Sequence, residues 1–147
     1  MRKLALLAVA TLALAAPAAA ASPLVPPFIQ SLVKEKAGAQ AYVPTRAPFR
    51  YTYLSYRWNA RDRILVVRLV DRRYPNRAAH TVFFSVHRFS GDCATGNQKS
   101  YQLDGNKVYS DANVAWRCLP GVKLLASGPN LPTVALGQVV ASAKKVR

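Results

Sequence analysis

Apolar and polar side chains alternate through residues 50–89 in the pattern of β-strands. The first predicted strand, residues 50–59, carries Leu54, Tyr56 and Trp58 on one face, and Tyr51, Tyr53 and Arg57 on the other. The second, residues 63–71, has branched apolar side chains on both faces, which predicts a central strand covered on each side. The third runs from His80 to Phe89, so the three strands should form a meander.

Turn residues divide the next segment into shorter strands that pair as hairpins. Asp104-Gly105 is typical of a two-residue hairpin turn, and it separates a strand at residues 101–103 from one at residues 107–109. Pro120-Gly121 turns the chain again, so residues 122–127 should pair back on the strand around Trp116.

Helical periodicity appears near the two ends of this strand-rich region. Pro27 suits the first turn of a helix that runs to Lys36 and stops at Gly38. The apolar side of this helix comprises Phe28, Ile29, Leu32 and Val33.

A second helix is predicted near the C-terminus. Leu136, Val139, Val140 and Ala143 recur at helical spacing, and Lys144, Lys145 and Arg147 follow where the negative end of that helix would lie. Gly137 and the valines weaken the helical pattern, so a strand within residues 132–145 is the alternative. Together the patterns predict an α+β domain, an antiparallel sheet of about five or six strands with a short helix near each end.

The N-terminal residues have the layout of a cleavable secretory signal peptide. Met1-Arg2-Lys3 is basic, Leu4 to Ala16 is apolar, and Ala18 to Ala21 offer small residues for cleavage after Ala20 or Ala21. An uncleaved membrane anchor is the alternative, but Pro17 interrupts the apolar run before the roughly 20 residues that a spanning helix needs. We therefore expect a signal peptide at residues 1–21 and a single secreted domain at residues 22–147.

The two cysteines are predicted to form a disulfide. Cys93 and Cys118 are the only cysteines in the chain, so one intramolecular pairing is possible, and an oxidising compartment would favour it. A metal site is the competing interpretation, but no histidine or carboxylate stands at the usual spacing from these cysteines. No cofactor or metal is expected.

Charge adds a preference for anionic partners. The chain has 21 basic and 6 acidic residues, and loss of Arg2 and Lys3 with the signal peptide leaves a net charge of +13. Such a field attracts polyanions and anionic surfaces, which outside the cytoplasm means an envelope polymer or a membrane surface rather than intracellular nucleic acid. A solvated basic surface with no dedicated ligand is the alternative.

Aromatic and basic residues alternate most densely in the meander. An arginine/tyrosine sheet face could pair with anionic groups and stack against rings. The candidate residues for this polyanion site are Arg57, Arg68, Arg72, Arg73, Arg77 and Tyr53. The alternative is that the aromatics belong to the core and the arginines only keep the strands soluble.

Catalytic chemistry has little support in the sequence. His80 and His87 are seven residues apart on one predicted strand, which places them on opposite faces and prevents shared metal binding. Ser85 and His87 share a face at contact distance, but no orienting acid or oxyanion hole accompanies them. We therefore identify no catalytic residue, and a basic nuclease-like hydrolase remains only as an alternative.

The order of elements resembles small bacterial extracytoplasmic domains of unknown function found in cell-envelope proteins, including the outer parts of anti-sigma-factor membrane proteins. The features that carry the resemblance are Tyr42-Val43-Pro44-Thr45 with a second proline, Leu103-Asp104-Gly105 followed by Val108-Tyr109, the strand at Trp116 and the terminal helix. The resemblance implies a non-catalytic module that binds an unknown partner. The chain departs from it by its cysteine pair and by the absence of an anti-sigma segment and a membrane span, so the signalling role is not carried over.

Overall fold

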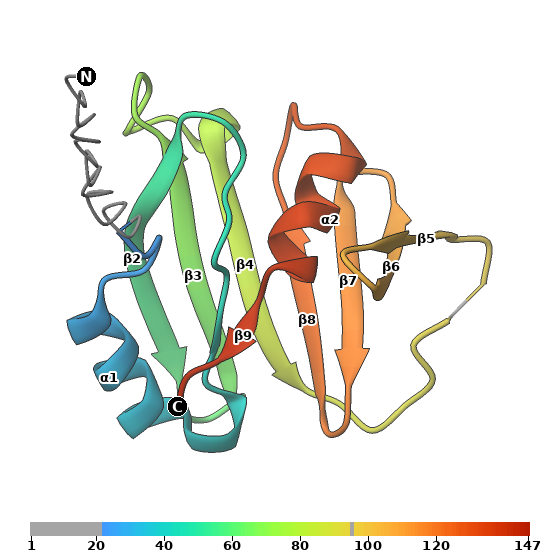
Figure 1. Ribbon diagram of the computed structural model, residues 1–147, viewed down its shortest axis with the longest axis horizontal. Coiled ribbons are helices and arrows are strands. Elements are labelled where there is room, and N and C mark those ends of the chain that lie inside the picture. The colour runs from blue at the N-terminus through green and yellow to red at the C-terminus, as the bar shows by residue number, and fades with distance from the viewer. Residues whose placement is uncertain (1–21, 95) are drawn as a thin grey trace, which may run out of the picture.

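The computed structural model describes residues 22–94 and 96–147, so the predicted signal peptide lies outside the described residues. A seven-stranded antiparallel sheet in the order β2-β3-β4-β8-β7-β6-β5 forms the body of the protein, with two helices and a two-stranded sheet, β1-β9, on one side (Figure 1). The elements are α1 (Pro27–Ala37), β1 (Tyr42–Val43), β2 (Tyr51–Asn59), β3 (Ile64–Asp71), β4 (Thr81–Arg88), β5 (Lys99–Leu103), β6 (Asn106–Asp111), β7 (Val114–Leu119), β8 (Val122–Ser127), α2 (Thr133–Ala141) and β9 (Lys144–Lys145).

The predicted α+β architecture is confirmed, with seven strands in the main sheet where five or six were expected. The meander β2-β3-β4 and the hairpins β5-β6 and β7-β8 form as predicted. In the β5-β6 turn, Asp104 and Gly105 both have positive φ angles, 50° and 75°, as the two-residue turn requires. A long-range pairing of β4 with β8, in register from Phe83↔Ser127 to Arg88↔Val122, joins the two halves into one sheet.

One face of the sheet is covered and carries the hydrophobic core. Alternate residues of the central strands, such as Leu65, Val67, Phe84 and Leu124, point to this face and are fully buried beneath α1, α2 and the β1-β9 pair. The opposite face has no helix or strand over it in the described part of the chain (Figure 1). The expectation that β3 is covered on both sides was therefore wrong. Of the branched residues of its second face, Ile64 and Val66 remain partly exposed, whereas Val70, near the end of the strand, is buried.

A β-bulge in β2 overturns the predicted division of its side chains. The register with β3 shifts between Tyr53 and Ser55, so Leu54 is inserted as an extra residue and is 40% exposed. Beyond the bulge the alternation is reversed. As a result four aromatic residues pack against the core on the covered face: Tyr51, Tyr53, Tyr56 and Trp58.

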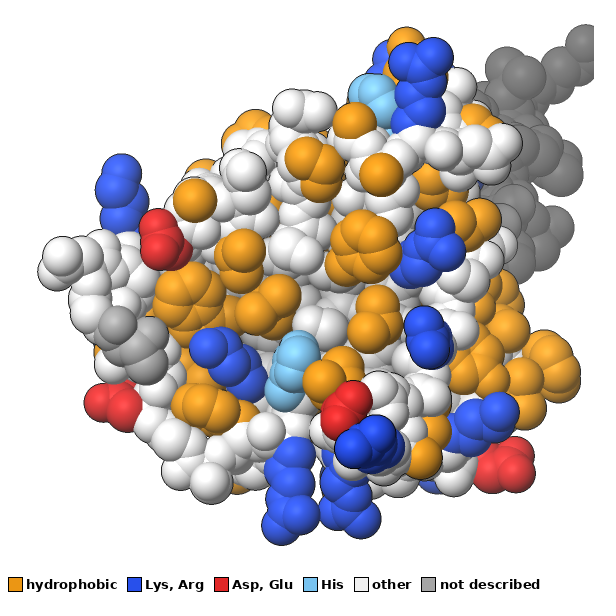
Figure 2. All heavy atoms as spheres, turned by 180° about the vertical axis from the view of Figure 1, so that it is seen from behind, with side chains coloured by type: hydrophobic (Ala, Val, Ile, Leu, Met, Phe, Trp, Pro, Cys, Tyr) orange, Lys and Arg blue, Asp and Glu red, His pale blue; other side chains and the backbone are white. Residues whose placement is uncertain are grey.

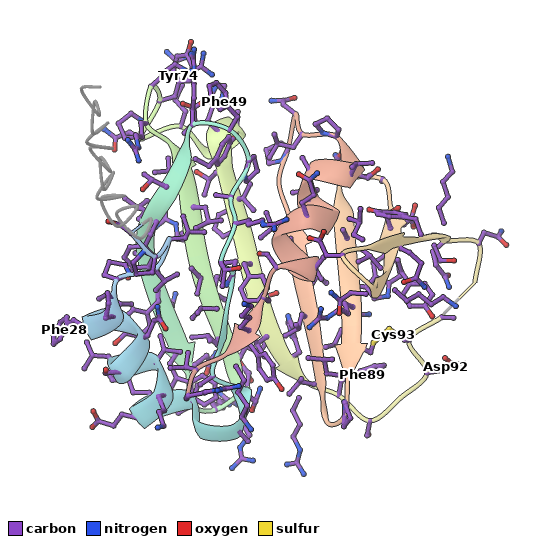
Figure 3. The ribbon with its side chains drawn as sticks, viewed as in Figure 1. Phe28, Phe49, Tyr74, Phe89, Asp92 and Cys93 are labelled. Atoms are coloured by element: carbon purple, nitrogen blue, oxygen red, sulfur yellow. A yellow bond between two sulfur atoms is a disulfide. The ribbon has the colours of Figure 1, made fainter. Side chains whose placement is uncertain are left out.

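The first helix forms as predicted, from Pro27 to Ala37, and ends at Gly38 with a φ angle of 54°. Val33 is fully buried, but Phe28, which was expected on the same apolar side, is 71% exposed and projects away from the protein (Figure 3). Neither helix in the described part of the chain has the length and apolar character needed to cross a membrane.

The C-terminal segment contains both a helix and a strand. Helix α2 ends at Ala141, and Lys144 and Lys145 pair with Val43 and Tyr42 instead of lying at the helix end as predicted. The negative end of the helix is met by Arg117 from β7, whose guanidinium donates to the carbonyl oxygens of Ala141 and Ala143. A cation from another strand therefore performs the role expected of the terminal lysines.

Candidate functional site

The uncovered side of the main sheet is the candidate functional site, and we call it the open face. Strand alternation and register assign its residues, which include Arg57, Val66, Arg68, Phe83, Ser85, His87, Lys107, Tyr109, Trp116, Lys123 and Leu125, and one acidic residue, Asp111, at the end of β6. Figure 2 shows this side, with hydrophobic side chains at its centre, a histidine beside them, and lysine and arginine side chains around them. Exposed apolar side chains bordered by cations make this side the candidate binding surface of the protein.

Arg57 and Arg68 define the outer end of the open face. Both line a hollow of about 590 Å³ together with Val66 and Phe83. The Arg68 guanidinium lies 5.8 Å from the centre of the Phe83 ring, and Phe83 itself is 38% exposed. This contact holds a cation and an apolar ring side by side at the surface.

A neighbouring hollow extends this end of the site into the loop between β3 and β4. It has a volume of about 510 Å³ and is lined by Arg68, Phe83 and Arg77 among others. Arg68 is common to both hollows. The three arginines Arg57, Arg68 and Arg77 therefore border one continuous part of the surface.

Lys123 is the central cation of the other end. Its ammonium group lies 5.0 Å from the Trp116 ring centre and 5.4 Å from that of Phe89. Tyr109 stacks on Trp116 with ring centres 6.0 Å apart, and Lys107 lies over Tyr109. Two lysines and three aromatic rings thus form a second cluster of cations and rings.

The disulfide holds a loop against this second cluster. Cys93 and Cys118 are joined, as predicted, and the Cys93 carbonyl oxygen accepts a hydrogen bond of 3.0 Å from the Trp116 indole nitrogen. Figure 3 shows Cys93 in the loop beside β7, with Phe89 at the beginning of the same loop. Trp116 is only 7% exposed as a result, so the loop and Lys123 form a cover over the tryptophan.

The positive charge of the open face is not neutralised by neighbouring carboxylates. The described residues form only two ion pairs, Arg46–Asp104 and Arg73–Asp71. Neither pair involves a cation of the open face. The field of these cations is therefore available to an external anion.

The structure brings only part of the predicted polyanion site together. Arg57, Arg68 and Arg77 lie on or beside the open face. Tyr53 does not, because the bulge turns it to the covered side, where it shares a different hollow with Arg72.

The sixth predicted residue, Arg73, is occupied by an ion pair. Its guanidinium makes two hydrogen bonds to the Asp71 carboxylate, and these hold the pKa of Asp71 at about 2. Its charge is therefore already compensated within the chain, unlike that of the open-face arginines.

The two histidines are not on one strand, contrary to expectation. His80 belongs to a short 3-10 turn before β4 and stacks on Tyr74 at 4.3 Å. His87 lies on the open face, and its Nε2 is 2.8 Å from the Ser85 hydroxyl, so the predicted contact of these two residues is present.

The Ser85–His87 pair lacks the remaining parts of a nucleophilic site. No carboxylate of the described residues accepts a hydrogen bond from His87, and burial, with a smaller effect of Lys123, lowers the pKa of His87 below 6.5. A neutral imidazole could accept the serine proton, but the hydrogen bonds of the described residues include no acidic group that would orient the ring. The described residues also contain no group of three or more His, Cys, Asp and Glu side chains that could hold a metal ion.

Removing the Lys123 charge should raise the pKa of His87. In Lys123→Ala the cation that disfavours imidazolium is gone, so an NMR titration should place the His87 pKa closer to 6.5 than in the parent protein. Because the pKa of His87 is lower in the folded than in the unfolded protein, the protein loses stability as the pH falls from 6.5 toward the folded pKa. Lys123→Ala should lose less stability than the parent over this pH range, because its folded His87 pKa is closer to 6.5. Lys107→Ala is the control, since Lys107 lies over Tyr109 and does not contribute to the His87 shift. An equal change of the His87 pKa in Lys123→Ala and Lys107→Ala would contradict the conclusion that the Lys123 charge lowers it.

Several residues of the open face were not identified from the sequence. These residues lie on four strands and one loop, and the β4-β8, β8-β7 and β7-β6 pairings bring them together: Phe83, Phe89, Trp116, Lys107 and Lys123. Strand alternation could have identified two of them. Phe83 and Lys123 each stand between two buried residues, so their side chains must point to the opposite face of the sheet.

Comparisons with protein family models, curated proteins and solved structures found no match to this chain.

Proposed function

We propose that this protein is a non-enzymatic, secreted binding module that holds an anionic polymer on its open face. The observation that carries the proposal is the set of open-face cations that lie over aromatic rings and have no carboxylate partner: Arg68 over Phe83, Lys107 over Tyr109 and Lys123 over Trp116. Such a surface offers both charge neutralisation and apolar contact to a chain that carries regularly spaced anions.

The expected location agrees with this proposal. A disulfide is typical of an oxidising, extracytoplasmic environment. The signal-peptide pattern of residues 1–21 indicates export, and the cell envelope then supplies the anionic polymers.

The spacing of the cations supports a polymer more than a single small anion. Arg57, Arg68 and Lys123 lie on β2, β3 and β8, and three steps between neighbouring strands separate the first from the last. At about 4.8 Å a step the cations span about 14 Å, which several consecutive anionic groups would fill. A second copy of the protein is a poor occupant, because two faces of the same positive sign would repel each other.

Neutralising the open face should weaken polymer binding about tenfold, and a matched variant should not. We expect Arg57→Gln/Arg68→Gln to bind a heparin oligosaccharide or dextran sulfate about tenfold more weakly than the parent, because two charge-assisted contacts are lost. Lys34→Gln/Lys36→Gln on α1 removes the same charge far from the open face and should change affinity by less than about twofold. Affinity of the parent should also fall steeply as salt increases.

Equal weakening in the two double variants would mean that net charge alone attracts the polymer, and the proposal would fail. Binding to vesicles of anionic lipid with no binding to the soluble polymers would instead assign the face to a membrane surface. Turnover of a nucleic-acid, peptide or glycan substrate that is lost in His87→Ala would replace the binding proposal with the hydrolase alternative.

A further inference from the structure

A second cationic site lies on the covered side of the sheet, away from the open face. The β1-β9 pair and the segment before α1 surround a cavity of about 740 Å³ there. The basic residues in its wall are Arg117, Lys144, Lys145 and Arg147, and none of the six acidic residues of the chain lines it. The volume lies within the range of small-molecule sites.

Arg117 is the unusual member of this wall. It is only 8% exposed, and its two terminal nitrogens donate to the carbonyl oxygens of Ala141 and Ala143 at 3.2 and 3.5 Å. Its Nε is buried and has no hydrogen-bond partner. Ala143 also lines the cavity, so the guanidinium sits at the cavity wall.

The charge of Arg117 is incompletely compensated. A buried guanidinium normally requires a carboxylate and a full set of acceptors, and Arg117 has neither. The end of α2 supplies the equivalent of about half a negative charge. Lys144 and Lys145, at the rim, add positive charge instead of removing it. This part of the protein therefore has a strong electrostatic preference for a bound anion.

The rest of the wall determines what kind of anion would fit. Leu24, Val25, Val43 and Val146 line the same cavity, and of these Leu24 and Val146 are partly exposed, whereas Val25 and Val43 are buried in the core. The Tyr42 and Gln30 side chains supply polar groups beside them. A small inorganic anion would leave the apolar part of the cavity unused.

We propose that this cavity binds a small organic anion, with a carboxylate or phosphate head group near Arg117, Lys144 and Lys145 and a short apolar body against Leu24 and Val146. This site is independent of the open face. The head group would supply the negative charge that the buried arginine lacks, and the apolar body would displace water from the opposite wall.

NMR titration of the full mature chain tests the proposal with four probes: hexanoate, hexyl phosphate, hexanol and inorganic phosphate. We expect saturable shifts with hexanoate or hexyl phosphate at the amides of Tyr42 and Lys145 and at the side-chain Nε–H of Arg117. Hexanol and inorganic phosphate should each bind at least about tenfold more weakly, because hexanol lacks the negative head group and inorganic phosphate lacks the apolar body. The tighter of the two anions identifies the head group.

Lys144→Gln/Lys145→Gln should weaken binding of the preferred anion about tenfold, since both side chains are exposed and their replacement leaves the fold intact. Lys34→Gln/Lys36→Gln on α1 is the matched control and should bind as the parent does. Equal affinity for hexanol and hexanoate, shifts confined to open-face signals such as Trp116, or unchanged binding in the Lys144/Lys145 variant would each overturn the proposal.

Discussion

Replacing both Cys93 and Cys118 with serine is expected to lower the free energy of unfolding by about 3.5 kcal/mol. The bridge joins residues 25 apart in the sequence, and the chain-entropy model gives this value for a loop of that length. Denaturant unfolding of the parent and the double variant under oxidising conditions measures the difference. The loss is a large fraction of the stability of a small domain.

Two further measurements separate the bridge from other effects of the substitutions. A reducing agent should destabilise the parent by a similar amount and leave the double variant unchanged. In a Trp58→Phe background, reduction should also shift the Trp116 emission to longer wavelength, because the loop that covers the indole is released. A difference below about 1 kcal/mol would contradict the chain-entropy prediction and would mean that the unfolded chain without the bridge retains residual structure.

Gly137→Ala is expected to destabilise the protein by about 2 kcal/mol, although alanine normally stabilises the middle of a helix. Gly137 lies within α2, and a Cβ atom added there would collide with the Tyr101 hydroxyl and come within 3.1 Å of a Leu103 methyl group. Relief requires Tyr101 to move, and its hydrogen bond to the Thr133 carbonyl would be lost. Thermal or denaturant unfolding gives the change directly.

Tyr101→Phe provides the test of the mechanism. It removes the hydroxyl that the new Cβ would meet, so Gly137→Ala should cost clearly less in the Tyr101→Phe background than alone. A stabilising effect of Gly137→Ala in the parent would show that helix propensity outweighs the steric contact, and the prediction would be wrong.

The same glycine illustrates what the sequence could and could not predict. From helical patterns alone, Gly137 weakened the prediction of a terminal helix. The structure gives a physical reason for the glycine, since α2 approaches β5 so closely that no side chain fits between them. Local propensity cannot anticipate such a contact, because Tyr101 and Gly137 are distant in the sequence.

Elements with strong local signals were predicted correctly. The first helix, the meander, the Asp104-Gly105 turn and the disulfide all depend on nearby residues or on simple counting. The β4-β8 pairing is a long-range contact with no local signal.

The candidate site was predicted less well than the fold. One inserted residue in β2 reversed the strand alternation and moved Tyr53 away from Arg57. Arg68 and Arg77 were identified, whereas Phe83 and Lys123 became visible only when the register was known. The buried position of Arg117 was also not predicted, although it shares one face of β7 with the apolar residues Ala115 and Leu119.

The β1-β9 pair also determines the order in which the protein can fold. The Ser142 hydroxyl accepts hydrogen bonds from the backbone amides of Thr45 and Arg46, and the Val146 amide donates to the Ala41 carbonyl. These contacts join positions about a hundred residues apart in the sequence. Contacts of such long sequence separation form late, because a large loop must close first. The N-terminal layer over the sheet cannot be completed until the C-terminal segment is present. A chain still emerging from the ribosome is therefore kept from its final compact state, and for the exported protein that we propose, this delay would preserve the unfolded form that passage through an export channel requires.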